Sequence, residues 1–448
     1  MKKIIVISAL LGTLSVTAQE HFAGISTSLR TGILNGTVNP AALANLTETF
    51  SFNVLSASAY MSNNKMGFSE LITSNDFEHS IFSGNKPASV RADFEVLGPS
   101  VAWKVDKWVF ALTTSGKTKA NIININNDLG NAIVNGALPE SVETAATVLV
   151  DYNQKASAIT WGEIGFSVAR QLYSENGHTL NGGVTVKLLM PGTNARMNAS
   201  NFSGTLAYHN NSVALTDAYS NVSFAYSGAL KDDFNNDTNF VDYFGKPGGV
   251  SADVGINYNW KPDEDKLYKV NAGIALRNMG SMTYSDPNNQ SNSYIINVPE
   301  GQYLDLQQFA GDDDLESIEQ KLVNSGFAQI VKQNTDFKVK TPATLAVYAD
   351  AQVYGNLYLG AYIQRKLNQD YKQNQISVQN VFTVTPRYAT QNFEAFMPVS
   401  SSEISGFAMG LGLRYRGFYI GSGSVITAVF NNTDTHQADA YAGFRFSL

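Results

Sequence analysis

Residues 250–260 read VSADVGINYNW, and this stretch decides the fold class of the chain. Apolar residues occupy every second position from Val250 to Trp260, while small or polar residues such as Asp253 and Asn257 fill the positions between them. Successive side chains of an extended strand point to opposite faces, so this segment would have one apolar and one polar face. The pattern therefore predicts a β-strand that separates two different environments.

The same alternation recurs in segments of about ten residues, the length at which a tilted strand crosses a bilayer. The apolar faces carry no Asp, Glu, Lys or Arg, whereas the opposite faces carry Arg277, Asp350 and Arg414. A soluble β-sandwich would show a similar alternation, but the strand length and the aromatic residues Trp260 and Tyr415 at the ends of apolar faces favour a membrane barrel. The other segments of this kind are 270–277, 343–353, 357–364, 407–415 and 439–448, and a further strand is predicted over 418–429.

Short and long connections alternate between these segments, as in an outer-membrane barrel with both termini on the periplasmic side. We expect an all-β fold: a transmembrane antiparallel β-barrel of about 14 strands, or about 16 if residues 367–403 add a hairpin. The short connections lie near 105–107, 173–178, 261–267, 354–356 and 416–417. The long connections cover roughly 61–91, 117–156, 229–248 and 280–340.

The last strand ends at the last residue of the chain. Phe444, Phe446 and Leu448 share one face, and this aromatic C-terminal strand resembles the signal that the barrel-assembly machinery reads. The final residue of that signal is usually Phe, whereas this chain ends in Leu448. We predict that the barrel-assembly machinery is a partner of the nascent protein.

The N-terminus predicts export. Lys2 and Lys3 precede an apolar run from Ile4 to Leu14, and small residues before Gln19 suit a cleavage site, so residues 1–18 are predicted to be a cleaved signal peptide. No later stretch approaches the roughly 18 apolar residues of a transmembrane helix. The predicted location is the bacterial outer membrane, where the barrel contacts lipid and lipopolysaccharide.

Residues 19–46 lie between the signal peptide and the barrel, which we assign to residues 47–448. This segment is rich in small residues and contains Asn39, Pro40 and Ala41 shortly before the first strand, which begins near Thr47. A compact segment of this kind is predicted to fold into the lumen as a hatch or plug. A periplasmic tail is the alternative.

The composition excludes several classes of function. Charged residues make up 15% of the chain, against about 25% in a typical soluble domain, and the formal net charge of -7 argues against nucleic acid as a partner. The chain has no Cys, and its five His residues are scattered. No catalytic or phosphate-binding motif appears. We therefore predict no enzyme activity, no metal and no cofactor.

Three loop segments have a local pattern of their own. Residues 139–150 and 312–331 have apolar residues at helical spacing and are predicted to be helices that pack on the loops or close the barrel mouth. Acidic and amide residues alternate from Asp233 to Asn239, but the Gly and Glu of a calcium-binding loop are missing, which favours a solvated loop.

The N-terminal segment carries a resemblance to a known family. With Asn39, Pro40 and Ala41 ahead of the first strand, the chain resembles the FadL-type outer-membrane transporters of hydrophobic compounds, in which such a segment forms a hatch inside a 14-stranded barrel. It is more similar to a Bacteroidota family of outer-membrane barrels of unknown function, through residues 32–46 and the glycine-rich residues 245–255. The resemblance implies a barrel with a hatch.

Two functions follow as hypotheses, and a hydrolase at the barrel rim is a third, weaker one. The first is passive uptake of a small hydrophobic molecule, and the second is a plugged barrel that presents its loops to a surface or secretion partner. In a transporter, polar-face residues would line the path through the lumen. The candidates are Tyr348, Tyr358, Tyr362, Arg277 and Arg414.

Overall fold

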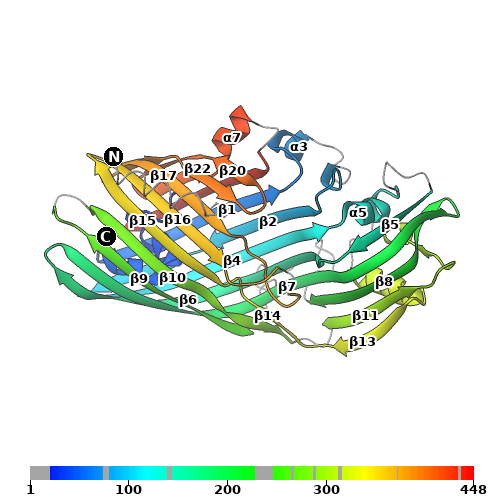
Figure 1. Cartoon of the computed structure of the whole chain (residues 1–448). Coiled ribbons are helices and arrows are strands. Elements are labelled where there is room, and N and C mark those ends of the chain that lie inside the picture. Colours follow the sequence, from blue (N-terminus) through cyan, green and yellow to red (C-terminus); the bar gives the residue numbers. More distant parts are fainter. Residues whose placement is uncertain are drawn as a thin grey trace, which may run out of the picture.

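The computed structural model describes residues 21–73, 80–138, 144–227, 246–263, 267–285, 289–310, 315–370, 372–431 and 435–448. These residues form a long antiparallel β-barrel (Figure 1). The predicted signal peptide, residues 1–18, lies outside the described residues. Within the described ranges, no helix combines the length and the apolar character needed to cross a bilayer.

The strands vary widely in length. Their bounds are β1 (Phe50–Asn63), β2 (Ala88–Leu97), β3 (Ser100–Val105), β4 (Trp108–Ile125), β5 (Ala145–Val150), β6 (Gln154–Glu175), β7 (His178–His209), β8 (Ser212–Ser227), β9 (Gly249–Trp260), β10 (Val270–Tyr284), β11 (Gln290–Val298), β12 (Leu304–Asp305), β13 (Ala328–Asn334), β14 (Phe337–Lys340), β15 (Thr344–Tyr354), β16 (Leu357–Lys366), β17 (Val381–Ala389), β18 (Phe393–Phe396), β19 (Val399–Ser402), β20 (Gly406–Met409), β21 (Leu411–Tyr415), β22 (Phe418–Ser422) and β23 (Gln437–Ser447).

The helices are short. They are the 3-10 helices η1 (Leu29–Thr31), η2 (Pro40–Asn45) and η5 (Gln307–Phe309) and the α-helices α2 (Ile33–Val38), α3 (Phe68–Thr73), α5 (Asn127–Val134), α6 (Leu315–Asn324) and α7 (Val425–Phe430).

A ring of 14 hydrogen-bonded strands closes the barrel, which confirms the predicted fold class and strand count. In β2–β3, β14–β15, β18–β19 and β20–β21, two consecutive segments together make one strand of the ring. The last strand β23 pairs with the first strand β1, where Phe446 lies opposite Phe52. The barrel therefore has no open edge along this seam, as a membrane-spanning sheet requires. In chain order the ring is β1, β2–β3, β4, β6, β7, β9, β10, β14–β15, β16, β17, β18–β19, β20–β21, β22 and β23.

The strand count is right, but one step of the reasoning behind it is wrong. Residues 381–402 do form the additional hairpin, β17 with β18–β19. The count remains 14 because β8 lies outside the ring: β7 pairs with β9 over residues 178–189 and with β8 only farther out, over residues 194–209. Sequence alternation does not reveal that one long strand changes its partner along its length.

The two ends of the barrel differ, and we call them the turn end and the loop end. Tight connections at Asp106–Lys107, Asn176–Gly177, Gly355–Asn356 and Arg416–Gly417 lie at the turn end, near the C-terminal residue Leu448. Positive φ angles at Asp106, Asn176, Gly355 and Arg416 produce these tight turns. The long connections join strand ends that lie at the opposite, loop end.

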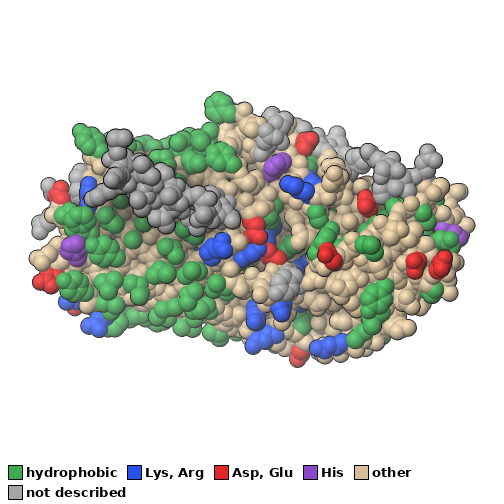
Figure 2. All heavy atoms as spheres, in the orientation of Figure 1, with side chains coloured by type: hydrophobic (Ala, Val, Ile, Leu, Met, Phe, Trp, Pro, Cys, Tyr) green, Lys and Arg blue, Asp and Glu red, His purple; other side chains and the backbone are tan. Residues whose placement is uncertain are grey.

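The outer surface of the half nearer the turn end is apolar. Figure 2 shows hydrophobic side chains covering the left half of this face, where β9, β10, β15 and β16 lie in Figure 1. Val254 and Ile256 of β9 point outward and are exposed, whereas Asp253 and Asn257 between them are buried inside. The predicted alternation therefore separates a lipid-facing surface from a polar interior.

At the loop end, the sheet continues beyond this apolar surface as an extension that has its own core. The extension consists of β5, the outer part of β7, β8, β11 and β13, and the helices α5 and α6 lie against it. Buried residues such as Phe202, Leu206, Val222 and Leu322 form the core. This extension makes the barrel much longer than a bilayer requires.

Several predicted boundaries in the loops are wrong. Residues 145–150 of the predicted helix 139–150 form strand β5, because they pair with residues 202–207, and residues 139–143 lie outside the described residues. Of the predicted helix 312–331, residues 315–324 form α6, whereas residues 328–334 form β13. The predicted strand 418–429 ends at residue 422 and is followed by α7.

Strand β4 continues to Ile125, well into the predicted loop 117–156. Lys117 and Lys119 in this stretch point into the lumen and form ion pairs with Glu95 and Asp93 of β2. A charge on the inner face of a barrel strand therefore does not end the strand.

Candidate functional site in the barrel lumen

Residues 21–46, which we call the hatch, lie inside the barrel against its inner wall. They contain η1, α2 and η2, and nearly all of their side chains are buried. Ser28 caps η1 by accepting a hydrogen bond from the backbone N–H of Arg30. Residues 21–46 therefore lie in the lumen, in contact with β9 and β17.

Asn39 anchors the hatch to the wall. Its side chain Oδ1 accepts a hydrogen bond from the backbone N–H of Ala41 at 3.0 Å, which caps η2, and Pro40 takes the first position of that helix. Its Nδ2 donates to the backbone carbonyl of Ile256 in β9 at 2.9 Å. The side chain therefore folds the hatch and attaches it to the barrel at the same time.

Three glycines on adjacent strands make room for this contact, and we call them the glycine seat: Gly183, Gly255 and Gly273. Gly183 of β7 and Gly255 of β9 are direct partners in the sheet. A Cβ atom at Gly255 would lie 2.1 Å from Asn39 Oδ1, and one at Gly183 would lie 2.4 Å from the backbone nitrogen of Ala41. Only glycine permits so close an approach, so the seat and the Asn-Pro-Ala segment are complementary.

A buried group of charges attaches the start of the hatch to another part of the wall. Arg387 of β17 forms ion pairs with Asp350 at 2.5 Å and with Glu394 at 2.8 Å, and its Nη2 donates to the carbonyl of Gly24 in the hatch at 2.6 Å. Arg414 Nε pairs with the other oxygen of Glu394 at 2.9 Å. The predicted lumen residue Arg414 thus belongs to a structural cluster, which we call the Arg387 cluster.

The three predicted lumen tyrosines are buried, and two of them contact the hatch. The hydroxyl of Tyr348 lies 3.4 Å from Asn39 Nδ2. Tyr358 accepts a hydrogen bond from Arg30 at 3.5 Å, and its ring lies 5.1 Å from the guanidinium. Tyr362 lines a cavity beyond the hatch. Tyr348 and Tyr358 therefore hold the hatch in this conformation and do not face an open path.

The wall on the side of β2, β4, β6, β7 and β9 carries a ladder of paired charges. Lys117 lies 3.5 Å from Glu95 and 3.4 Å from Glu163, and Lys187 lies 2.7 Å from Asp253. These side chains are nearly buried, and each charge has an opposite partner. Pairing offsets much of the cost of removing these charges from water.

A second segment enters the lumen from the loop end. Residues 372–380, which we call the inward loop, are the second part of the connection between β16 and β17, and the side chains of Ile376 and Val378 are buried. Lys155 of β6 holds this loop by donating to the carbonyl of Gln375 at 2.9 Å. The lumen is thus filled from one end by the hatch and from the other by the inward loop.

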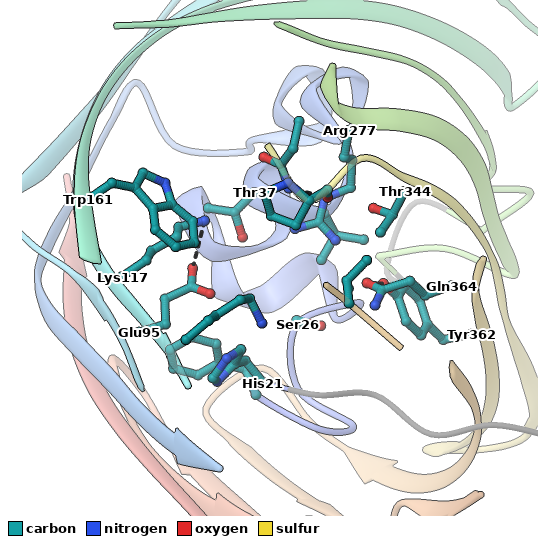
Figure 3. Close-up of a pocket in the computed structure, with 16 residues that line it drawn as sticks. His21, Ser26, Thr37, Glu95, Lys117, Trp161, Arg277, Thr344, Tyr362 and Gln364 are labelled. Carbon is teal, nitrogen blue, oxygen red and sulfur yellow. Dashed lines mark hydrogen bonds and ion pairs between the residues drawn. The ribbon is translucent and has the colours of Figure 1, made fainter. Parts of the chain in front are cut away.

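A small cavity of about 70 Å³ remains between these two closures. His21 and Thr37 of the hatch and Arg277 and Tyr362 of the wall line this cavity (Figure 3), as does Val378 of the inward loop. Arg277 Nε, a predicted lumen group, is buried here without a hydrogen-bond partner among the described residues. Sites for small organic ligands usually measure about 300–1,000 Å³, so this cavity holds only a few water molecules.

On the loop-end side of the cavity lies a cluster of apolar side chains inside the barrel, which we call the apolar layer. Trp161 belongs to both the cavity lining and this layer. From the turn end to the loop end, the lumen therefore contains the hatch, the cavity and the apolar layer. The members of the layer are Ile159, Trp161, Leu189, Met282, Tyr284, Val339 and Ile376.

The predicted assembly signal lies at the seam of the barrel. Phe444 and Phe446 point outward and are exposed, and the backbone N–H of Leu448 donates to the carbonyl of Phe50 at 2.9 Å. All three side chains are therefore exposed on the outside of the barrel. Their role as a signal stays a prediction.

Nothing among the described residues gathers into a metal site: no group of three or more His, Asp or Glu side chains is placed to hold a metal ion. The residues from Asp233 to Asn239, considered as a calcium loop, lie outside the described residues. His21 contacts Ser58 and His178 contacts Tyr258, so these two histidines sit in ordinary hydrogen bonds.

The sequence missed the partners on which the hatch depends. Glu394 and Arg387 lie within residues 367–403, for which the sequence allowed either a loop or an additional hairpin, so neither residue was singled out. Gly183 and Gly273 look like ordinary small residues of the polar faces. A signal did exist, because these glycines interrupt an otherwise polar inner face beside Asn257 and Asn271.

A family model of unknown function, DUF5723, matches residues 40–423. The chain belongs to the DUF5723 family. The match begins at Pro40 of the hatch and extends through β22, so it covers the glycine seat and the Arg387 cluster. The predicted membership in a family of unknown function is confirmed. No curated protein sequence matches this DUF5723 chain.

Several solved structures are similar to this DUF5723 protein. The toluene transporter TbuX of Ralstonia pickettii is 11% identical, with 96% of this chain and 99% of that chain covered and a TM-score of 0.46. The toluene transporter TodX of P. putida is 10% identical, with 93% and 94% covered and a TM-score of 0.43. A FadL homologue of Pseudomonas aeruginosa is 10% identical, with 96% and 97% covered and a TM-score of 0.37.

Proposed function

We propose that this protein is a gated channel of the bacterial outer membrane in which the hatch closes the lumen. The observation that carries the proposal is that residues 21–46 fill the barrel through reversible contacts, chiefly the hydrogen bonds of Asn39 and of Gly24. A segment held in this way can move while the 14-stranded wall stays intact. A wall strand has no such freedom, because its removal breaks two ladders of hydrogen bonds.

The predicted export signal and the outer surface support the location. The exposed apolar side chains of the half nearer the turn end suit a bilayer, and the longer polar half suits the outer face of a cell. On this proposal the turn end faces the periplasm, the barrel-assembly machinery inserts the protein, and lipopolysaccharide surrounds its outer half.

The solute that we propose is a small organic molecule with a hydrophobic part. The apolar layer supports this, because it offers an apolar environment inside an otherwise polar lumen. The cavity of about 70 Å³ is too small for such a molecule. Passage therefore requires movement of both closures, the hatch and the inward loop.

Reconstitution into proteoliposomes tests the proposal. Four proteins are compared: the mature chain, a variant that lacks residues 21–46, an Asn39→Ala variant, and a control with Val429→Ser and Phe430→Ser on the exposed helix α7. Entry of a small aromatic alcohol and of a polar solute of equal size is measured. Faster migration of unboiled than of boiled protein on a gel shows that each barrel is folded.

A gated channel predicts faster entry through the variant without the hatch and through Asn39→Ala, and unchanged entry through the α7 control. The hydrophobic solute should gain more than the polar one. Equal permeability of all four folded proteins would overturn the proposal. A gain confined to the polar solute would retain the channel and reject the hydrophobic solute.

A second candidate function, a surface scaffold, rests on the extension at the loop end. Its outer strand β13 exposes Ile330 and Val331 beyond the half that suits a bilayer. A scaffold predicts that Ile330→Asp with Val331→Asp abolishes association with a surface partner and leaves permeability unchanged. If the same double variant alters solute entry, the extension belongs to the channel.

A further inference from the structure

An open cleft of about 550 Å³ lies at the loop end, next to the inward loop. The inner face of the sheet, with residues of β6, β7, β8, β11, β13 and β14, forms one side, and residues 372–374 of the inward loop form another. A cleft of this volume is within the range of sites for small organic ligands. The apolar layer adjoins it, because Phe337 in the cleft stacks on Tyr284 of that layer at 5.0 Å.

Positive charge dominates the cleft. Lys155 and Arg196 are buried in its floor, with exposed fractions of 2% and 9%, and Lys332 and Lys338 lie at its rim. Asp336 is the acidic residue of the lining. Neither Lys155 nor Arg196 has a carboxylate within ion-pair distance among the described residues, in contrast to the paired charges deeper in the lumen.

Two side chains in the floor have unused hydrogen-bonding groups. Arg196 Nε and both amide atoms of Asn198 are buried without a hydrogen-bond partner among the described residues. The guanidinium of Arg196 lies over the ring of Phe337 at 5.4 Å, which fixes its plane. Buried polar groups without partners are costly, so a ligand that accepts hydrogen bonds from them gains the corresponding free energy.

Only neutral acceptors of the inward loop hold the two cations. Arg196 Nη1 donates to the carbonyl of Gln373, and Lys155 Nζ donates to the carbonyl of Gln375 at 2.9 Å and to the hydroxyl of Ser377 at 3.2 Å. An anion accepts stronger hydrogen bonds from Arg and Lys than a carbonyl does. An anion in the cleft would therefore compete with the loop for these donors.

We propose that Lys155, Arg196 and Asn198 form a binding site for a phosphate group, and that its occupation releases the inward loop. A phosphate has several acceptor oxygens and up to two charges, which suits a planar guanidinium, an ammonium and an amide N–H around one cleft. The role of the site in solute entry rests on the proposed channel, since the phosphate would belong to a solute whose apolar part reaches the apolar layer.

The cleft opens on the inner face of the sheet, whereas lipid faces the outer one. The phosphate source that we propose is therefore a free phosphorylated solute and not a lipopolysaccharide headgroup. Binding is measured by calorimetry in detergent micelles free of lipopolysaccharide, with pyrophosphate and inorganic phosphate as probes. Vesicles that contain lipopolysaccharide form a separate arm.

Arg196→Gln removes the charge and keeps a hydrogen-bonding side chain of similar length, and Lys107→Gln at the turn end is the matched control. We expect Arg196→Gln to weaken pyrophosphate binding about tenfold or more, as expected for loss of a charged hydrogen bond. Lys107→Gln should bind as the parent protein does. Unboiled gel migration verifies that both variants are folded.

The absence of Cys from the chain allows a direct readout of the inward loop. In a Val378→Cys variant, the thiol replaces a side chain that is 3% exposed, so a maleimide reacts with it only when the loop moves. Pyrophosphate should accelerate this labelling several-fold, and Arg196→Gln added to the variant should abolish the acceleration.

Failure of the parent protein to bind either probe at millimolar concentration, or unchanged binding by Arg196→Gln, would overturn the site. Binding of the lipopolysaccharide vesicles alone, lost in Arg196→Gln, would overturn the free solute as the source. Binding without faster labelling would overturn the release of the loop. If the site binds but hatch deletion leaves permeability unchanged, the proposed channel fails and the phosphate site stands.

Discussion

Substitution of Gly255 by Ala tests whether the glycine seat holds the hatch. A Cβ at this position would lie 2.1 Å from Asn39 Oδ1 and 3.1 Å from Ala275 Cβ. The first distance is far below van der Waals contact, so the Asn39 side chain must leave its place. The wall has less freedom to adjust, because Gly255 lies in a strand that is paired on both sides.

The expected effect follows from the hydrogen bonds that Asn39 loses. Its cap on η2 and its bond to the carbonyl of Ile256 are each worth about 1 kcal/mol, so the seated hatch should be destabilised by about 2 kcal/mol. This corresponds to a roughly 30-fold larger fraction of molecules with the hatch displaced. In an Asn39→Ala background the clash with the amide is absent, so Gly255→Ala should cost less than about 1 kcal/mol there.

Hydrogen exchange of the hatch amides measures the seated fraction directly, and proteoliposome permeability measures its consequence. The four proteins of the cycle are the parent, Gly255→Ala, Asn39→Ala and the double variant. We expect faster exchange over residues 33–46 in each single variant and little further increase in the double variant. Exchange in β15 and β16 serves as the internal control, because these strands should stay protected.

Two results would refute this reasoning. Parent-like exchange of the hatch in Gly255→Ala would show that the side chain of Asn39 does not secure it. Additive effects in the double variant would show that Gly255 and Asn39 act independently and that the seat is not complementary to the hatch.

Three further predictions concern the wall and its surroundings. Arg387→Met leaves the buried carboxylates of Asp350 and Glu394 without their partner and should lower the free energy of unfolding in micelles by about 3–5 kcal/mol, measured by urea titration. Arg387→Lys should cost less, and an equal cost would contradict a role for the ion pairs of Arg387 with these two carboxylates. Phe444→Arg places a charge on the lipid-facing side, which near the midplane should destabilise the inserted barrel by about 2 kcal/mol or more and so reduce the folded, heat-modifiable fraction in the membrane. An unchanged fraction would place this residue away from lipid. Removal of divalent cations with EDTA should leave the midpoint of thermal unfolding unchanged; a decrease that calcium reverses would assign a site to the loop from Asp233 to Asn239.

Much of the barrel was predictable because the information is local. An alternation such as that from Val250 to Trp260 needs only neighbouring residues to be read, and it marks which side chains point toward lipid. Tight turns are equally local, since positive φ at Asn176 and Gly177 depends on two residues. The predicted barrel and the short connections of the turn end follow from such patterns, whereas the count of 14 also depends on the change of partner along β7.

The candidate site was less predictable because its parts are distant in sequence. Asn39 was singled out, but its partners Gly255 and Gly273 lie more than 200 residues away, and only the closed ring brings them together. Arg414 was predicted to face the lumen and does so, yet whether it lines a path or holds the hatch depends on Glu394 and Arg387. Alternation tells which face a side chain occupies and not which residue it meets there.

The sequence alone was enough to predict the two faces of each strand, a strand at the C-terminus and a compact segment ahead of the barrel. The tertiary structure alone decided that β7 exchanges β9 for β8 along its length, that the inward loop returns into the lumen, and that unpaired cations gather in one cleft. The physical reason is that strand alternation is a property of consecutive residues. Partner choice and charge balance are properties of side chains that meet only after the barrel has closed.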